Sequence, residues 1–323
     1  MKINDLLKEN DSISNEDFYY YKDLIVNSNY FTNNFESIKD GNALHHGTDV
    51  TLSNMDIIDI TERSQPKDTD VVIHDIVNEL SKQHFGIKIR NKLFITPNNS
   101  IASSYGINTY KIIPLGDYNI YQSNNIRDLY ADLSIIINYD ELESLIFEKI
   151  YDALTKHQYV NDISKLINKD FNKIIDDNKD SFLEDLSIIS PQNYIEILRT
   201  GTLPKNLVVS KITDLFKNTF ADDIDDIDDN DKENEIIEAL KLFEQLLKDT
   251  IYSLNDTIYK IIKNHFVTNI DKKYIETIET TQKIENLDYF SESILDAKQA
   301  LFLKPSLYAD IIEDIIRDYT NED

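Results

Sequence analysis

The stretch that decides the fold is "KLFITPNNSIASSYGINTYKIIPLG" (92–116). Its two apolar, β-branched runs, 92–96 and 109–116, are bounded by Pro, Gly and Asn clusters, which is the pattern of strands separated by turns. Upstream, apolar residues recur at helical spacing through 71–85, and Gly86 follows them as a helix stop. Strands and a helix therefore alternate along this part of the chain.

The N-terminal segment "SNEDFYYYKDLIVNS" (14–28) predicts a short helix with Ser14 as its N-cap and Asp17 completing a box-like start. Five of the six Gly and four of the six His lie between residues 41 and 116. The turn-rich, compact part of the fold is concentrated there. We expect residues 1–132 to form an α+β core.

From about residue 139 the pattern changes to long charged segments without Gly until Gly201, with apolar residues three or four apart. These segments predict helices. The clearest is 234–268, whose apolar stripe packs on its own domain or serves a coiled coil or a partner, with an oligomer through this helix as one outcome. We expect a helical insertion or domain over 133–285.

Residues 286–323 are expected to return to the core as a strand and a terminal helix. The run "ALFLKP" (300–305) has the composition of a strand, expected near 299–304. The alternative is that this run begins a helix continuing through "SLYADIIEDIIRDY". Pro305 favours a break.

The acidic stretch "ADDIDDIDDNDKENE" (221–235) suggests calcium at first sight. A calcium-binding EF-hand loop needs a Gly at its sixth position for the sharp turn, and this stretch has none. A solvated linker is the better interpretation.

The composition narrows the function. The chain has 33 Lys and Arg and 59 Asp and Glu, which gives a net charge of -26. This negative charge argues against a broad surface for binding nucleic acid. There is no Cys, so thiolate catalysis and disulfides are excluded. Neither a signal peptide nor a membrane span is evident, so we expect a soluble protein without a membrane partner.

The motif "LHHGT" (44–48) places two histidines side by side. A metal site built from the four N-terminal histidines is one alternative, but neighbours on a strand point to opposite faces, so no metal is expected. Those histidines are His45, His46, His74 and His84. Signatures of zinc proteases, α/β-hydrolases, P-loop enzymes and Rossmann dehydrogenases are absent from the sequence.

The order of motifs over residues 40–132 resembles the ADP-ribosyltransferases of the H-Y-E class, which include the poly(ADP-ribose) polymerases. "HGT" (46–48) is similar to that class's His-Gly-(Ser/Thr) strand end, and "LFIT" (93–96) followed by "NNSIASSYG" (98–106) is similar to its strand and short helix. The segments "RSQPKDT" (63–69) and "FGIKIR" (85–90) also look like those of an uncharacterised group of tailed-bacteriophage proteins.

This resemblance implies a split-sheet core that binds NAD as a substrate. His46 would bond a ribose hydroxyl, since imidazole offers a donor and an acceptor. Gly47 would let the backbone reach the nicotinamide amide, with Thr48 completing the motif. Tyr105 would stack on the cationic nicotinamide, and Arg90 would lie near the diphosphate.

The third element of the class is a Glu on a late strand, and here the sequence departs from the pattern. The expected position falls on Gln299 or Ala300. Gln can hydrogen-bond a hydroxyl but supplies no negative charge. Glu141 and Glu143 are alternatives, although they fit better at a helix start, where acidic residues complement the dipole.

Two functions follow. The first is an NAD-dependent mono-ADP-ribosyltransferase of phage origin that modifies a macromolecular acceptor. The second is a catalytically degenerate fold of the same kind, acting as a virion-associated structural or interaction protein with phage particle components as partners. Either would reside in the host cytoplasm or the virion.

Overall fold

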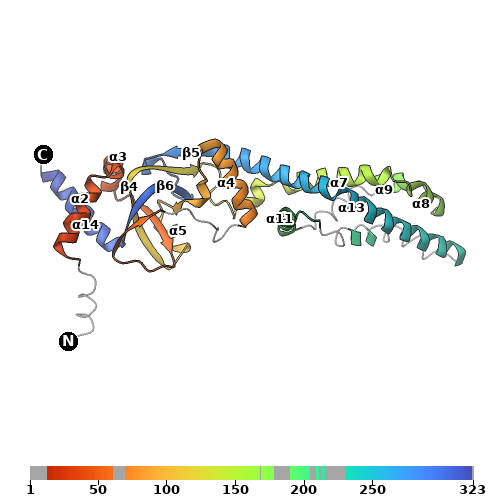
Figure 1. Ribbon diagram of the computed structural model, residues 1–323, viewed down its shortest axis with the longest axis horizontal. Coiled ribbons are helices and arrows are strands. Elements are labelled where there is room, and N and C mark those ends of the chain that lie inside the picture. The colour runs from red at the N-terminus through yellow and green to blue at the C-terminus, as the bar shows by residue number, and fades with distance from the viewer. Residues whose placement is uncertain are drawn as a thin grey trace, which may run out of the picture. The chain divides into compact units, whose positions relative to one another are not determined.

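The computed structural model describes residues 13–60, 70–167, 169–177, 190–203, 209–210, 213–214 and 230–321 (Figure 1). The chain divides into two compact units, one of residues 1–132 with 271–323 and the other of residues 133–270. The first unit combines helices with a six-stranded antiparallel sheet, which agrees with the expected α+β class.

The sheet is built on two long central strands. Its strands are β1 (Leu44–Thr48), β2 (Met55–Asp59), β3 (Leu93–Ile95), β4 (Asn108–Ser123), β5 (Ile278–Thr281) and β6 (Ser293–Leu303). β4 and β6 pair along most of their length, and each has two short strands, one after the other, on its outer edge. β1 and β5 share the edge of β4, and β2 and β3 share the edge of β6.

Short helices and turns of the first unit begin and end at the residues that the local sequence predicts. α2 (Asn15–Val26) begins after Ser14, whose hydroxyl accepts from the Asp17 N–H. α4 (Val71–Phe85) ends at Gly86, which has a left-handed φ of 78°. Three further elements are α3 (Asn29–Lys39), the 3-10 turn η1 (Ile89–Asn91) and α5 (Asn99–Ser104).

The late part of the chain settles the choice between strand and helix. β6 begins at Ser293, earlier than the expected 299–304, and α14 (Pro305–Asn321) follows it directly. The prediction that Pro305 separates a strand from a helix is confirmed. Because β5 pairs with β4, the expected end of the helical region at 285 is too late; the second unit ends at Ile270.

The core of the first unit is formed by side chains of the sheet and of the helices α2, α3 and α14, which lie close together in Figure 1. The fully buried side chains include Tyr30 of α3, Ile112 of β4 and Leu301 of β6. Burial of such apolar side chains contributes about 1.5–3 kcal/mol each. This packing holds the two central strands in place.

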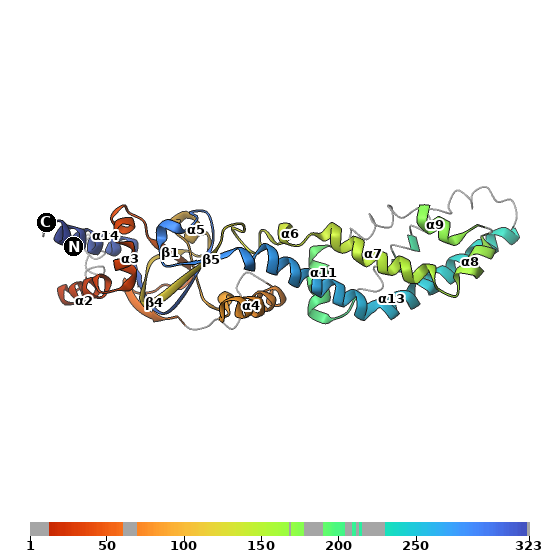
Figure 2. The ribbon, with the colours of Figure 1, turned by 90° about the horizontal axis from the view of Figure 1, so that it is seen from above.

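The second unit is helical. α7 (Tyr139–Thr155) runs beside the long α13 (Asn230–Lys273) in Figure 2, and Tyr139 contacts Phe266 edge to face. The other helices given for the described residues of this unit are α6 (Leu133–Ile136), α8 (Val160–Leu166), α9 (Phe171–Asp177) and α11 (Pro191–Thr200). α13 exceeds the expected 234–268, and residues 221–229 of the acidic linker lie outside the described residues. No described helix has the length and apolarity that crossing a membrane requires.

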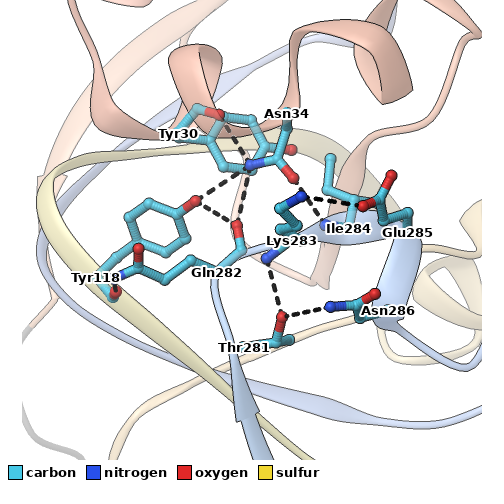
Figure 3. Close-up of polar contacts among 9 residues, drawn as sticks. All are labelled: Tyr30, Asn34, Tyr118, Thr281, Gln282, Lys283, Ile284, Glu285 and Asn286. Atoms are coloured by element: carbon cyan, nitrogen blue, oxygen red, sulfur yellow. Dashed lines mark hydrogen bonds and ion pairs between the residues drawn. The ribbon is translucent and has the colours of Figure 1, made fainter.

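One buried side chain joins α3 to the turn after β5. The Asn34 amide donates to the carbonyls of Tyr30 and Gln282 and to the Tyr118 hydroxyl, and its oxygen accepts from the Ile284 N–H (Figure 3). Asn34 is 3% exposed and interrupts the helical backbone with φ -127°. The kink aims the amide at segments 248 and 250 residues later in the chain.

We therefore expect Asn34→Ala to lower the free energy of unfolding by about 3 kcal/mol, since it removes the acceptor of the buried Ile284 N–H and a donor to the Tyr118 hydroxyl. The neighbouring Asn33 is exposed and donates to the Gln282 side chain at 3.3 Å. Asn33→Ala is the matched control and should cost less than about 0.5 kcal/mol. Denaturant unfolding of the three proteins measures both values, and equal effects would contradict the assignment.

Candidate functional site

β1 and the end of β3 are joined by a single backbone bridge, and beyond it the two segments do not pair. His45 exchanges both backbone hydrogen bonds with Thr96, at 2.8 and 3.0 Å, just beyond the end of β3. In an antiparallel ladder the next such pair would join Gly47 to Phe94. Instead, the Phe94 carbonyl is 2.7 Å from Nδ1 of the His46 ring. By the same alternation, the N–H and C=O of Gly47 point toward β3 and away from β4.

The contact with Phe94 assigns the His46 tautomer. A carbonyl oxygen only accepts, so Nδ1 carries the proton and Nε2 is the acceptor of the neutral ring. The ring is half-buried and meets Phe302 of β6 edge to face, with centroids 5.7 Å apart. His46 therefore has a fixed ring orientation.

Two glycines let α5 lie directly on β1. A Cβ on Gly47 would stand 1.7 Å from the Ala102 carbonyl oxygen, and one on Gly106 would stand 2.3 Å from the Thr48 carbonyl carbon. Neither glycine has the positive φ that would otherwise account for it. Close backbone approach explains both residues, and it brings the end of α5 against Gly47 and Thr48.

Tyr105 caps the C-terminus of α5. Its hydroxyl donates to Asp128 Oδ2 at 3.2 Å, while Asp128 Oδ1 accepts from the N–H groups of Tyr130 and Ala131. Burial, followed by the charges of Glu292 and Asp128, raises the pKa of Tyr105 well above its usual range. The Tyr105 hydroxyl therefore contacts one carboxylate, Asp128, and is influenced by the charge of a second, Glu292.

Glu292 directly precedes β6, and it is the residue that the sequence interpretation missed. Its Oε2 accepts from Nη1 of Arg90 at 3.0 Å, and both side chains are largely buried, at 12% and 8% exposed. The Arg90 guanidinium stands 4.3 Å from the centre of the Phe94 ring. Phe94 thus contacts His46 through its carbonyl and Arg90 through its ring.

Gln299 lies elsewhere. It is seven positions after Glu292 along β6, faces Asp59 across the β2 pairing and donates to that carboxylate at 2.8 Å. Ala300 is fully buried between β4 and β2. Phe94 thus links His46 to Arg90, and Arg90 pairs with Glu292, whose charge acts on Tyr105. Neither residue at the expected late-strand position takes part in these contacts.

The alternative carboxylates belong to the second unit. Glu141 lies in the first turn of α7, where its N–H is capped by Asn138. Glu143 is buried beside the Tyr194 hydroxyl, and burial raises its pKa. Within the described part of the chain, no group of three or more His, Cys, Asp or Glu side chains is placed to hold a metal ion.

His45 points away from its neighbour and is 5% exposed. Its Nε2 accepts from the Lys111 ammonium at 3.2 Å. Burial, aided by the Lys111 charge, lowers the pKa of His45 to about 4. His45 is therefore neutral at physiological pH and serves the packing of β1 on β4.

This lowered pKa predicts a loss of stability in acid. The unfolded chain binds a proton on His45 near pH 6.5, while the folded chain resists it until about pH 4, so folding is disfavoured as the pH falls through this window. From pH 7 to pH 5 the group costs about 2 kcal/mol. Wild-type protein should lose that much more than His45→Gln in denaturant unfolding; parallel losses would contradict the assignment.

Comparison of the chain with protein-family models, curated proteins and solved structures finds no match. The site is therefore argued from its own geometry and from the motif order in the sequence.

Proposed function

We propose that the chain is an NAD-dependent mono-ADP-ribosyltransferase whose site comprises His46, Gly47, Tyr105 and Glu292. The observation that carries the proposal is the position of Glu292, which pairs with Arg90 at the start of a late strand and whose charge acts on Tyr105. Glu292 provides the negative charge that Gln299 lacks. This favours the active enzyme over the catalytically degenerate alternative.

The charges around Tyr105 suit the substrate better than the product. Glu292 and Asp128 bring two negative charges, and the Arg90 guanidinium brings one positive charge. The nicotinamide ring of NAD is cationic and becomes neutral when it leaves. The carboxylates and the face of Tyr105 would therefore hold the ring before bond cleavage and release it afterwards.

The remaining contacts follow from β1. The backbone N–H and C=O of Gly47 offer one donor and one acceptor, which matches the two hydrogen-bonding groups of a carboxamide. Nε2 of His46 is an acceptor for a ribose hydroxyl, and Thr48 lies two residues further on the same strand. Backbone groups held by a sheet are pre-organised, so binding costs little further ordering.

In the reaction the bond between ribose C1′ and the nicotinamide nitrogen breaks, and its electron pair leaves with neutral nicotinamide. Positive charge develops on the ribose, where a carboxylate at Glu292 would stabilise it. A lone pair of the acceptor then forms the new bond to C1′, and the acceptor loses a proton. The acceptor is a macromolecule in this proposal, in keeping with the motif resemblance.

The test is to incubate the protein with NAD, alone and with host lysate, and to measure released nicotinamide and ADP-ribose bound to macromolecules. The proposal expects release and labelling that grow with protein concentration. Absence of release, together with no rise of the melting temperature on adding NAD, would reject it in favour of the structural or interaction role.

A further inference from the structure

Arg90 is buried, and both its backbone N–H and its guanidinium contact other residues of the protein. Its backbone N–H donates to the buried Asn78 side chain at 3.0 Å, and its guanidinium hydrogen-bonds with the Tyr274 hydroxyl as well as with Glu292. The Phe94 ring covers one face of the guanidinium. With the residue only 7% exposed, Arg90 is built into the fold rather than extended toward solvent.

The anchor of Arg90 begins in α4. Asn78 of that helix donates to Asn91 at 2.8 Å and contacts His74 at 3.1 Å. His74 also reaches Asn91, again at 3.1 Å. This buried polar cluster fixes the η1 turn, and a fixed turn holds the guanidinium at one place beside the start of β6.

We infer that Arg90 is a positioning residue that holds the Glu292 carboxylate ionised and oriented toward Tyr105, and that it makes no contact with the NAD diphosphate. This inference rests on the proposed function, because the orientation of Glu292 matters only if that carboxylate acts on a substrate. A planar guanidinium between Phe94 and Glu292 fixes the direction of its hydrogen bonds, which a flexible ammonium would not.

Among the residues that the structure describes, four side chains lie near the Glu292 carboxylate. They are Arg90 of η1, Tyr274 at the end of α13, Tyr105 at the end of α5 and Asp128 in the loop after β4. Arg90 is the cation that pairs with the carboxylate, while the Arg127 carbonyl accepts from the Glu292 N–H at 2.9 Å and the Arg127 guanidinium lies over the Phe290 ring. Removal of its charge leaves Glu292 near Asp128 in a poorly hydrated place, so Glu292 would take up a proton at higher pH.

Kinetics separate the two roles of Arg90. If it positions Glu292, Arg90→Met lowers kcat by about 100-fold, leaves the KM for NAD within about twofold and moves the acid limb of the pH profile upward. Arg90→Lys keeps the charge but not the planar fork, so the acid limb stays in place while kcat falls by about 10-fold. A diphosphate role predicts a raised KM with kcat unchanged, and that result would overturn the inference.

A second measurement does not depend on activity. In protein labelled with 13C at the Glu carboxyls, the Glu292 signal is identified by its loss in Glu292→Gln, and its titration is followed in wild type and Arg90→Met. The midpoint should rise by about one pH unit or more. An unchanged midpoint would overturn the inference whether or not the protein releases nicotinamide. Absence of nicotinamide release would count against the proposed function alone.

Folding of the variants is controlled with the double variant Arg90→Met/Glu292→Gln. Because it removes both members of the buried pair, it should melt at a higher temperature than Arg90→Met, which leaves one charge unpaired. A melting temperature no higher than that of Arg90→Met would show that the pair is not coupled, and would overturn the inference.

Discussion

Glu292→Gln should slow nicotinamide release by roughly 10²–10³-fold while leaving NAD binding nearly intact. Gln keeps the size and hydrogen-bonding capacity of the side chain but removes its negative charge. Loss of a pre-organised group that stabilises transition-state charge typically costs roughly 10²–10³-fold in kcat. The reduction should therefore appear in kcat, measured as nicotinamide release at saturating NAD.

A matched control lies on the same strand. Asp296 of β6 pairs with Lys92 at 3.1 Å and belongs to no part of the proposed site. Asp296→Asn removes one negative charge near Glu292 in the chain, yet kcat should stay within about twofold of wild type. If both substitutions reduce kcat equally, the effect is one of general charge and Glu292 has no special role.

The second large effect concerns Gly47. A Cβ at this position would stand 1.7 Å from the Ala102 carbonyl oxygen. Because that oxygen belongs to the backbone, no side-chain rotation relieves the clash. Gly47→Ala should force α5 away from β1 and lower the free energy of unfolding by about 3 kcal/mol or more. A loss of this size corresponds to a fall in melting temperature of order 10 °C.

Val50→Ala is the control for Gly47→Ala. Val50 lies just after β1 and is 60% exposed, so its substitution should change the melting temperature by less than about 2 °C. Gly106→Ala should resemble Gly47→Ala, since its Cβ would meet the Thr48 backbone from the other side. Unchanged stability of both glycine variants would show that α5 does not lie against β1 as described.

Local signals predicted the helix ends well. Ser14, Gly86 and Pro305 act through their own backbone geometry or through a hydrogen bond to a near neighbour, so each can be interpreted without knowing the fold. The two strand runs at 92–96 and 109–116 were equally clear. β5 escaped notice because "IETT" is short and has no apolar alternation.

The candidate site was only partly predictable, for a physical reason. His46, Gly47 and Tyr105 belong to recognisable motifs. Glu292 does not, and it is identified by its ion pair with Arg90, which lies 202 residues earlier in the chain. The sequence interpretation placed the carboxylate inside the apolar run of β6, whereas in the structure Glu292 directly precedes the first residue of that strand. An acidic residue flanked by serines in "SESILDA" (291–297), directly before that run, was the available signal.

The central claim is that one site, made by Gly47, His46, Tyr105 and Glu292, holds NAD. The most direct measurement is a crystal structure of Glu292→Gln with NAD, which this much slower variant would leave largely intact. The account predicts the nicotinamide ring on Tyr105, its amide bonded to the Gly47 backbone and a ribose hydroxyl at Nε2 of His46. NAD bound at another place, or no NAD in the site at saturating concentration, would contradict it.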